Sequence, residues 1–177
     1  MKLNFGSNNK KIEGFLNVDA LPLENVDVVC DFNEAPYPFD NDSAVEILAI
    51  ELLEHLSYKS ARIFLNECFR ILKPGGEFIV QVPNIGEMCR MYTFGQVCSC
   101  VPHKAIVQSD FKADKNCPEC SGAGRINPQR WKFAFSGAQK HEFDFHLSHW
   151  TGEILKKEIT AVGFSRVQRI DHIYKLI

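Results

Sequence analysis

The stretch YKSARIFLNECFRILKPGGEFIVQVP, residues 58–83, carries the strongest fold signal in the chain. Its apolar residues recur at spacings of three and four, which predicts an amphipathic helix over residues 58–72. The Lys-Pro-Gly-Gly sequence at 73–76 is typical of a helix end. A run rich in β-branched and aromatic residues then predicts a strand over 77–83. Together with a strand predicted at 45–50, this pattern indicates a right-handed parallel crossover.

Short apolar runs on both sides of this unit predict further strands, because Gly, Asn, Asp or Pro bounds most of them. Toward the N-terminus they cover residues 2–5, 15–19 and 26–31. Toward the C-terminus a helix over 151–161 precedes strands at 164–170 and 173–177. This alternation of strands and helices predicts an α/β fold.

The composition is that of a soluble globular protein of one domain. The chain has 177 residues, of which 45% are hydrophobic and 24% charged, and its formal net charge is -2. This charge excludes a general attraction to nucleic acid or to anionic membranes. The sequence contains no apolar run of about 18 residues and no signal peptide pattern, so we expect a cytoplasmic protein without a membrane partner.

Polar residues follow the first three strands at the edge where parallel sheets bind ligands. Gly6 would let a ligand approach the backbone closely. Asp19 could accept the hydroxyl protons of a ribose, and Asp31 with Phe32 could bind an adenine amino group and cover its ring. Each residue alone also fits a simple turn or loop cap, but their order along the chain predicts an adenosine site.

Five motifs in chain order resemble a known family. They are LNFGSN at 3–8, GFLNVD at 14–19, VVCD at 28–31, LEHL at 53–56 and RILKPGG at 70–76. They look like the class I S-adenosylmethionine-dependent methyltransferases, and among these the small type-11-like group. The resemblance covers roughly residues 2–84 and 137–177. It implies a Rossmann-like methyltransferase fold, with a mostly parallel sheet of seven strands and an antiparallel last strand, and S-adenosylmethionine (SAM) as cofactor.

The resemblance also implies a set of cofactor-binding residues. They are Gly6, Ser7 and Asn8 in the first loop, Asp19 at the ribose, Asp31 and Phe32 at the adenine, and Ile50 and Glu51 near the methionine part or the adenine. The glycine-rich loop of the family keeps only Gly6 here, and Asn8 tolerates the left-handed conformation that the loop needs. The helix between the first two strands is reduced to residues 7–14. For Glu54 and His55 we expect a structural role.

Residues 85–137 interrupt the pattern and predict a subdomain inserted into a single domain that spans 1–177. The segment contains two close cysteine pairs whose spacing fits a tetrahedral structural zinc site. The candidate ligands are Cys98, Cys100, Cys117 and Cys120, with His103 as a substitute for one of them. Such a site would explain how a segment with few apolar residues is ordered. Four cysteines in a polar loop, without metal, are the alternative.

The histidine-rich segment at 141–150 lies where the resembling family has its substrate pocket. His146 is the best match to a histidine of that pocket, and it could act as a general base toward an acceptor hydroxyl or amine. Alternatively, His146 caps a helix or lies on the surface without a catalytic role. A less favoured alternative is a metal site formed by His141, Asp144 and His146.

Three functions fit these patterns. The first is methyl transfer from SAM to an O or N atom of a small molecule or sugar. The second is a catalytically silent methyltransferase-like subunit, and the third is an enzyme that modifies RNA or protein and docks through the zinc insertion. Basic and aromatic residues alternate near Trp131, but nearby acids make nucleic acid a less favoured partner. The reduced crossover makes a homodimer plausible.

Overall fold

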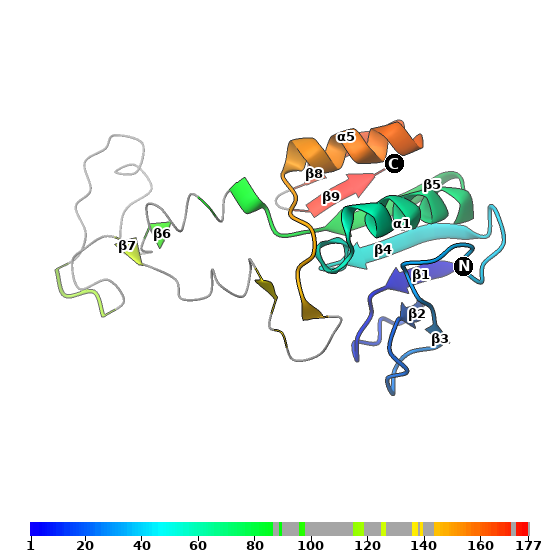
Figure 1. The fold of residues 1–177 in the computed structure, drawn as a ribbon, viewed down its shortest axis with the longest axis horizontal. Coiled ribbons are helices and arrows are strands. Elements are labelled where there is room, and N and C mark those ends of the chain that lie inside the picture. Colours follow the sequence, from blue (N-terminus) through cyan, green and yellow to red (C-terminus); the bar gives the residue numbers. More distant parts are fainter. Residues whose placement is uncertain are drawn as a thin grey trace.

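The structure is a computed structural model (Figure 1). It describes residues 1–86, 89, 96–97, 115–118, 125–126, 136–137, 139, 144–170 and 173–176. Among these residues no helix combines the length and the apolar character needed to cross a bilayer.

Seven strands form one sheet in the order β3-β2-β1-β4-β5-β9-β8. Their bounds are β1 Lys2–Phe5, β2 Leu16–Asp19, β3 Val28–Val29, β4 Ala44–Ile50, β5 Leu72–Gln81, β8 Val167–Ile170 and β9 Ile173–Leu176. The strands from β3 to β5 pair in parallel, and β9 is antiparallel to both of its neighbours. The predicted Rossmann-like sheet with an antiparallel last strand is therefore confirmed. Two short strands, β6 Gln96–Val97 and β7 Arg125–Ile126, form a separate antiparallel pair.

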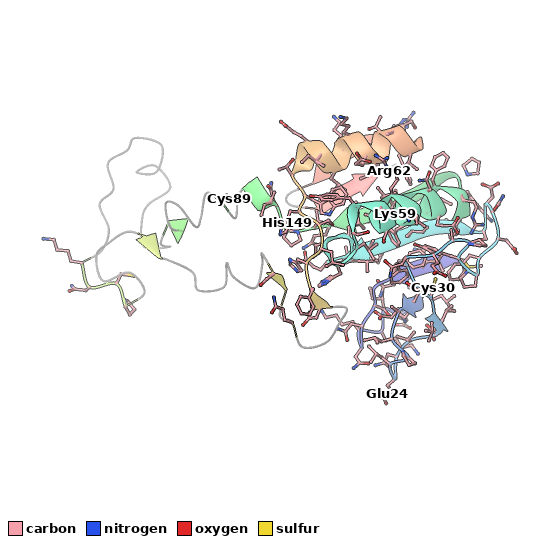
Figure 2. All side chains as sticks on the ribbon, viewed as in Figure 1. Glu24, Cys30, Lys59, Arg62, Cys89 and His149 are labelled. Atoms are coloured by element: carbon pink, nitrogen blue, oxygen red, sulfur yellow. The ribbon has the colours of Figure 1, made fainter. Side chains whose placement is uncertain are left out.

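Two helices, α1 (Tyr58–Ile71) and α5 (Gly152–Val162), lie together over the sheet (Figure 1). Each begins at a hydroxyl cap, because Ser57 Oγ accepts a hydrogen bond from the amide of Ser60 and Thr151 Oγ1 from that of Ile154. Arg62, labelled in Figure 2, extends from α1 and binds Glu158 of α5 at 2.8 Å. A short 3-10 helix, η1 (Leu53–His55), connects β4 to α1.

Phe5 of β1 lies at the centre of an aromatic core. It is fully buried and contacts Phe32, Phe39 and Phe64 edge-to-face, with ring centroids 5.4–5.9 Å apart. Burying a phenylalanine side chain contributes about 1.5–3 kcal/mol. This core joins the loop after β3 to helix α1, which positions the residues that follow the first three strands.

The connections between β1 and β4 contain no helix, and the structure describes all of their residues. The predicted reduction at residues 7–14 is thus confirmed. A buried amide network holds these short connections. Asn4 Nδ2 donates to Asn17 Oδ1 at 3.0 Å, and Asp27 Oδ2 accepts from the amide and from Nδ2 of Asn17 at 2.8 and 3.3 Å. Because both asparagines are buried, these bonds satisfy polar groups that would otherwise destabilise the fold.

Most element boundaries lie within one or two residues of the predictions, and three segments differ in a way that has a structural reason. The Lys-Pro-Gly-Gly sequence does not form a loop after the helix, since α1 ends at Ile71 and β5 begins at Leu72. Gly75, with φ +81°, lies within β5, and the β4–β5 register shifts between Ala44 and Glu46. The strand predicted at 26–31 is only two residues long, because β3 is an edge strand that pairs with the end of β2 alone. β8 starts later than predicted, and Phe164 before it packs on Phe69 and Phe78.

Candidate functional site

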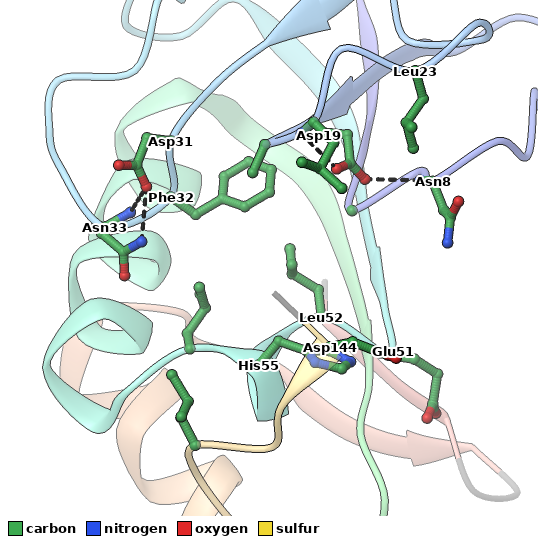
Figure 3. Close-up of a pocket in the computed structure, with 15 residues that line it drawn as sticks. Asn8, Asp19, Leu23, Asp31, Phe32, Asn33, Glu51, Leu52, His55 and Asp144 are labelled. Carbon is green, nitrogen blue, oxygen red and sulfur yellow. Dashed lines mark hydrogen bonds between the residues drawn. The ribbon is translucent and has the colours of Figure 1, made fainter. Parts of the chain in front are cut away.

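A cavity of about 490 Å³ opens beyond the carboxyl ends of the parallel strands (Figure 3). This is the edge at which open α/β sheets bind ligands. The predicted cofactor residues that line it are Gly6, Asn8, Asp19, Asp31, Phe32 and Glu51. In Figure 3, Asn8 and Asp19 lie on one side of the cavity and Glu51, His55 and Asp144 on the other.

Ser7 and Ile50, also predicted to bind the cofactor, do not line this cavity. Ser7 is buried, and its amide donates to the carbonyl of Val18 at 3.2 Å. Ile50 is half-buried, and the alternation along β4 places it on the opposite face from Ala49.

Gly6 makes the turn after β1 with φ +68°, and its amide donates to the Val18 carbonyl at 2.9 Å. A Cβ at this position would lie 3.0 Å from Cδ1 of Leu52. The turn therefore requires glycine for two reasons, the left-handed backbone and the close approach to a residue that lines the cavity. Asn8 also has a left-handed backbone, with φ 49°.

The Asp19 carboxylate holds two loops in place. Its Oδ2 accepts a hydrogen bond from the amide of Asn8 at 2.8 Å, and its Oδ1 accepts one from the amide of Leu21 at 3.0 Å. Each carboxylate oxygen has a second lone pair, which remains suitable for a ribose hydroxyl.

Asp31 fixes the loop on the other flank of the cavity. Its Oδ1 accepts from the amide and from Nδ2 of Asn33, at 2.9 and 2.8 Å. Phe32 is 3% exposed, so most of its ring belongs to the aromatic core and little of it can cover a ligand.

The second wall of the cavity comes from η1 and from the segment after residue 144. The amides of Leu147 and Ser148 both donate to the Glu54 carbonyl, at 2.7 and 3.1 Å, and Ser148 Oγ donates to the Leu53 carbonyl at 2.9 Å. These bonds bring His146 against His55, with ring centroids 4.9 Å apart. His55 lines the cavity, whereas His146, the predicted general base, lies beside it and does not.

Glu54 is the most perturbed carboxyl group of this wall. It is 2% exposed, and among the described residues neither carboxylate oxygen has a hydrogen-bond partner. Burial, followed by the negative charge of Glu51, raises the pKa of Glu54 to about 9. One oxygen of Glu54 and one ring nitrogen each of His55 and His146 lie within 4.8 Å of one another.

The sequence did not predict this grouping, although it singled out each of its three residues. Glu54 and His55 were expected to be structural, and His146 was considered with His141 and Asp144 instead. The usable signal was the adjacent Glu-His pair directly after a strand, together with a second histidine in the segment that closes the same edge.

The predicted zinc ligands fall mostly outside the described residues. This applies to Cys98, Cys100, Cys120 and the substitute His103, and also to His141. Cys117 is described and is buried, at 8% exposure. The zinc site and the division at residues 85–137 therefore stay predictions.

Comparison with known proteins finds a methyltransferase domain in part of the chain. A family model described as a methyltransferase domain matches residues 12–80, which include β2, β4 and α1. A probable S-adenosylmethionine-dependent methyltransferase of Mycolicibacterium smegmatis is 40% identical over 52 residues. Both comparisons find a SAM-dependent methyltransferase domain in this chain. The segment matched in the relative makes up 29% of this chain and only 20% of the length of that relative.

Solved structures share the fold of this chain at low sequence identity. A protein of Pyrococcus horikoshii has a TM-score of 0.56 at 14% identity, covering 99% of this chain and 79% of that one. A SAM-dependent methyltransferase of Thermotoga maritima, titled a possible histamine N-methyltransferase, has a TM-score of 0.54 at 14% identity, covering 99% and 80%. A chain from the Haloferax volcanii complex of the Trm112 methyltransferase activator with a putative methyltransferase has a TM-score of 0.51 at 16% identity, covering 95% and 62%.

Proposed function

We propose that this chain binds SAM in the cavity at the sheet edge and transfers its methyl group to an O or N atom of a small molecule or sugar. The observation that carries the proposal is the loop pair held by Asp19. Its carboxylate binds the Asn8 amide and keeps acceptor capacity for a ribose beside the close backbone approach at Gly6.

The residues of the cavity fit the cofactor in size and in chemistry. A volume of about 490 Å³ is within the usual range of roughly 300–1,000 Å³ for small-molecule sites. The carboxylates of Asp19 and Asp31 suit the hydroxyl and amino hydrogens of an adenosine, and Leu21 and Leu23 offer apolar contacts.

When bound, SAM would supply a methyl group on a sulfonium. The acceptor lone pair would attack the methyl carbon in line with the carbon–sulfur bond, and S-adenosylhomocysteine would leave with the electron pair of that bond. The chain contributes mainly by holding the acceptor in that line, since correct positioning lowers the barrier strongly. His55 lines the cavity and His146 lies beside it, so one of them can take the proton that the acceptor loses.

The test is calorimetric titration of the purified chain with SAM and, separately, with S-adenosylhomocysteine. Asp19→Ala should weaken binding at least about tenfold, the size expected for losing hydrogen bonds to a charged group. Glu24→Gln is the matched control, because it removes one negative charge from the exposed tip of the same loop (Figure 2). Failure of the folded wild-type chain to bind either compound would contradict the proposal and favour the silent subunit.

The inserted segment supports a second, structural part of the proposal. We infer that Cys98, Cys100, Cys117 and Cys120 hold a structural zinc ion, on the basis of their paired spacing. An RNA or protein acceptor docked through this insertion is the alternative to a small molecule. Salt-dependent binding of RNA would favour an RNA acceptor.

A further inference from the structure

The buried Glu54 carboxylate needs an explanation. Both of its oxygens are inaccessible to solvent and unpartnered among the described residues. An unpaired carboxylate in such a place destabilises the fold unless it is protonated or meets a cation. No Lys or Arg side chain in the described part of the chain forms an ion pair with it. The groups that surround it are two histidines and a second carboxylate, that of Glu51.

One of the two histidines, His55, is held as metal ligands usually are. His55 Nδ1 lies 3.2 Å from the carbonyl oxygen of Phe145. Since a carbonyl only accepts hydrogen bonds, Nδ1 must carry the proton, and Nε2 is then the ring nitrogen whose lone pair can bind an ion. A hydrogen bond from the second ring nitrogen to a carbonyl is the usual way in which proteins orient a ligating histidine.

The chain builds this arrangement from two distant segments. Glu54 and His55 belong to η1, and the segment that carries His146 is fastened to η1 by three hydrogen bonds. Trp150 Nε1 extends the same set by donating to Ser148 Oγ at 2.8 Å. The ligand atoms therefore stay close to one another without relying on an exposed, flexible side chain.

We propose that Glu54, His55 and His146 bind one divalent cation beside the methyltransferase cavity. Two imidazoles and one carboxylate suit Mn²⁺, Fe²⁺, Co²⁺ or Zn²⁺. The donor atoms lie within 4.8 Å of one another, and ligands on one ion lie about 3–4 Å apart for bonds near 2.1 Å, so small side-chain rotations suffice. The cation would give the buried Glu54 carboxyl group the partner that its oxygens lack among the described residues.

This site deepens the proposed function, on which the following step rests. Three protein ligands leave coordination positions open, as in catalytic metal sites, and His55 faces the cavity. An acceptor with a hydroxyl group, or two neighbouring hydroxyls, would bind there through oxygen. The cation would lower the pKa of the bound hydroxyl. Because His55 and His146 would then be ligands of the cation, the proton would pass to solvent and not to either histidine. The oxygen would then form a bond to the SAM methyl carbon while the carbon–sulfur bond breaks. The electron pair of the broken bond would stay on sulfur, and S-adenosylhomocysteine would leave.

The test measures the metal by itself. The folded chain is titrated with Mn²⁺ by electron paramagnetic resonance and calorimetry without SAM, and with Co²⁺ by visible absorption in parallel. Mn²⁺ favours carboxylate and imidazole over thiolate, so the cysteine pairs should not compete. We expect about one Mn²⁺ per chain, with affinity reduced at least about tenfold in Glu54→Gln and in His146→Ala.

His149→Ala is the matched control, since it removes a histidine from the same segment but outside the cluster, and it should bind Mn²⁺ like the wild type. Circular dichroism checks that each variant is folded. Titration of Glu54→Gln with SAM separates this inference from the proposed function, because the variant should keep SAM while losing Mn²⁺. Absence of stoichiometric binding of both ions, or binding unchanged in both cluster variants, would overturn the inference.

Discussion

At the residue scale, one carboxylate joins helix α1 to the loop that follows β3. Glu67 Oε2 accepts a hydrogen bond from the Tyr37 amide at 2.7 Å. Arg70 binds both oxygens of Glu67, at 2.9 and 2.6 Å, and also donates to the Phe39 carbonyl at 2.8 Å. This loop begins at residues that line the cavity. The ion pair of Glu67 and Arg70 therefore helps to hold the cavity wall in place.

Replacing Glu67 should destabilise the protein in a pH-dependent way. The hydrogen bonds and charge of Arg70, with the Tyr37 amide, hold the pKa of Glu67 below its usual value. A carboxylate with a lowered folded-state pKa contributes stability that is present above its unfolded pKa and is lost as pH falls through its folded pKa. Glu67→Gln should therefore lower the free energy of unfolding by about 2 kcal/mol at pH 7, and by much less in acid.

Urea denaturation at pH 7 and below pH 4 measures this difference. Glu46→Gln serves as the control, because Glu46 forms an ion pair with the half-exposed Lys2, and exposed pairs contribute only about 0–1 kcal/mol. Equal losses in the two variants, or a Glu67→Gln loss that stays constant into acid, would refute the assignment.

The sequence could locate those site residues whose position depends only on the neighbouring strand. Gly6, Asp19 and Asp31 stand directly after strands, so the sheet edge that parallel strands share predicts where they lie. The cluster of Glu54, His55 and His146 depends instead on how two segments far apart in the chain are fastened together. No spacing rule encodes that contact, and the histidines were therefore assigned separately.

At the element scale, the connection from β1 to β2 replaces a crossover helix with a turn. Gly6 and Gly14 both adopt left-handed backbone conformations in this turn, with φ +68° and +81°. They differ in their surroundings, because a Cβ at Gly6 would press on Leu52, whereas one at Gly14 would meet nothing within 4 Å. Comparing substitutions at the two glycines therefore distinguishes the effect of backbone strain from that of contact with the cavity wall.

Gly6→Ala should weaken SAM binding, and Gly14→Ala should not. Both substitutions should lower stability by about 1–2 kcal/mol through the left-handed backbone. Only the first should displace Leu52, which lines the cavity. Thermal denaturation and SAM titration of the two variants measure these effects. Equal SAM affinities of a folded Gly6→Ala variant and the wild type would show that the close approach of Gly6 to Leu52 is not needed for SAM binding.

The elements themselves were predictable where packing and periodicity agree. Helix α1 begins at its predicted residue because Ser57 caps it and its apolar face meets the sheet. The strand nature of the Lys-Pro-Gly-Gly sequence was not predictable, since Pro74 and Gly75 favour turns locally. There β5 continues because its first residue, Leu72, pairs with Ala44, a contact that depends on the whole sheet.

At the scale of the whole molecule, the two helices α1 and α5 pack on one side of the sheet, and polar side chains stabilise the other. Asn4 and Asn17 pair in register on β1 and β2, and the alternation of the strands places them opposite the buried Leu3, Phe5 and Val18. The hydrogen bond between them, and those that Asn17 donates to Asp27, hold β1, β2 and the start of β3 together without crossover helices. The site thus rests on a sheet whose first strands are fixed by amides and by the aromatic core.

Metal content offers a test of the inserted segment as part of the whole chain. Cys117 is buried although its neighbours Asn116 and Pro118 are exposed, so its side chain is turned inward in a segment with little apolar sequence. We expect the purified chain to carry about one zinc ion, because four thiolates bind zinc with all positions filled and thereby order such a segment. Cys117→Ser should lose this zinc and become sensitive to protease within residues 98–120.

The sheet should keep its melting temperature within about 3 °C in that variant. None of the core residues in the described part of the chain belongs to the insertion, and a loss of 1 kcal/mol shifts the melting temperature by about 2–4 °C. Cys89→Ser, which changes an exposed cysteine outside the two pairs, should retain the zinc. Elemental analysis and limited proteolysis decide the question. Absence of zinc from the folded wild-type chain would contradict the predicted zinc site in the insertion. Full zinc retention in Cys117→Ser would show that Cys117 is not a necessary ligand. Because the cation proposed at Glu54 does not involve thiolates, it should survive Cys117→Ser, so the two sites can be lost independently of each other.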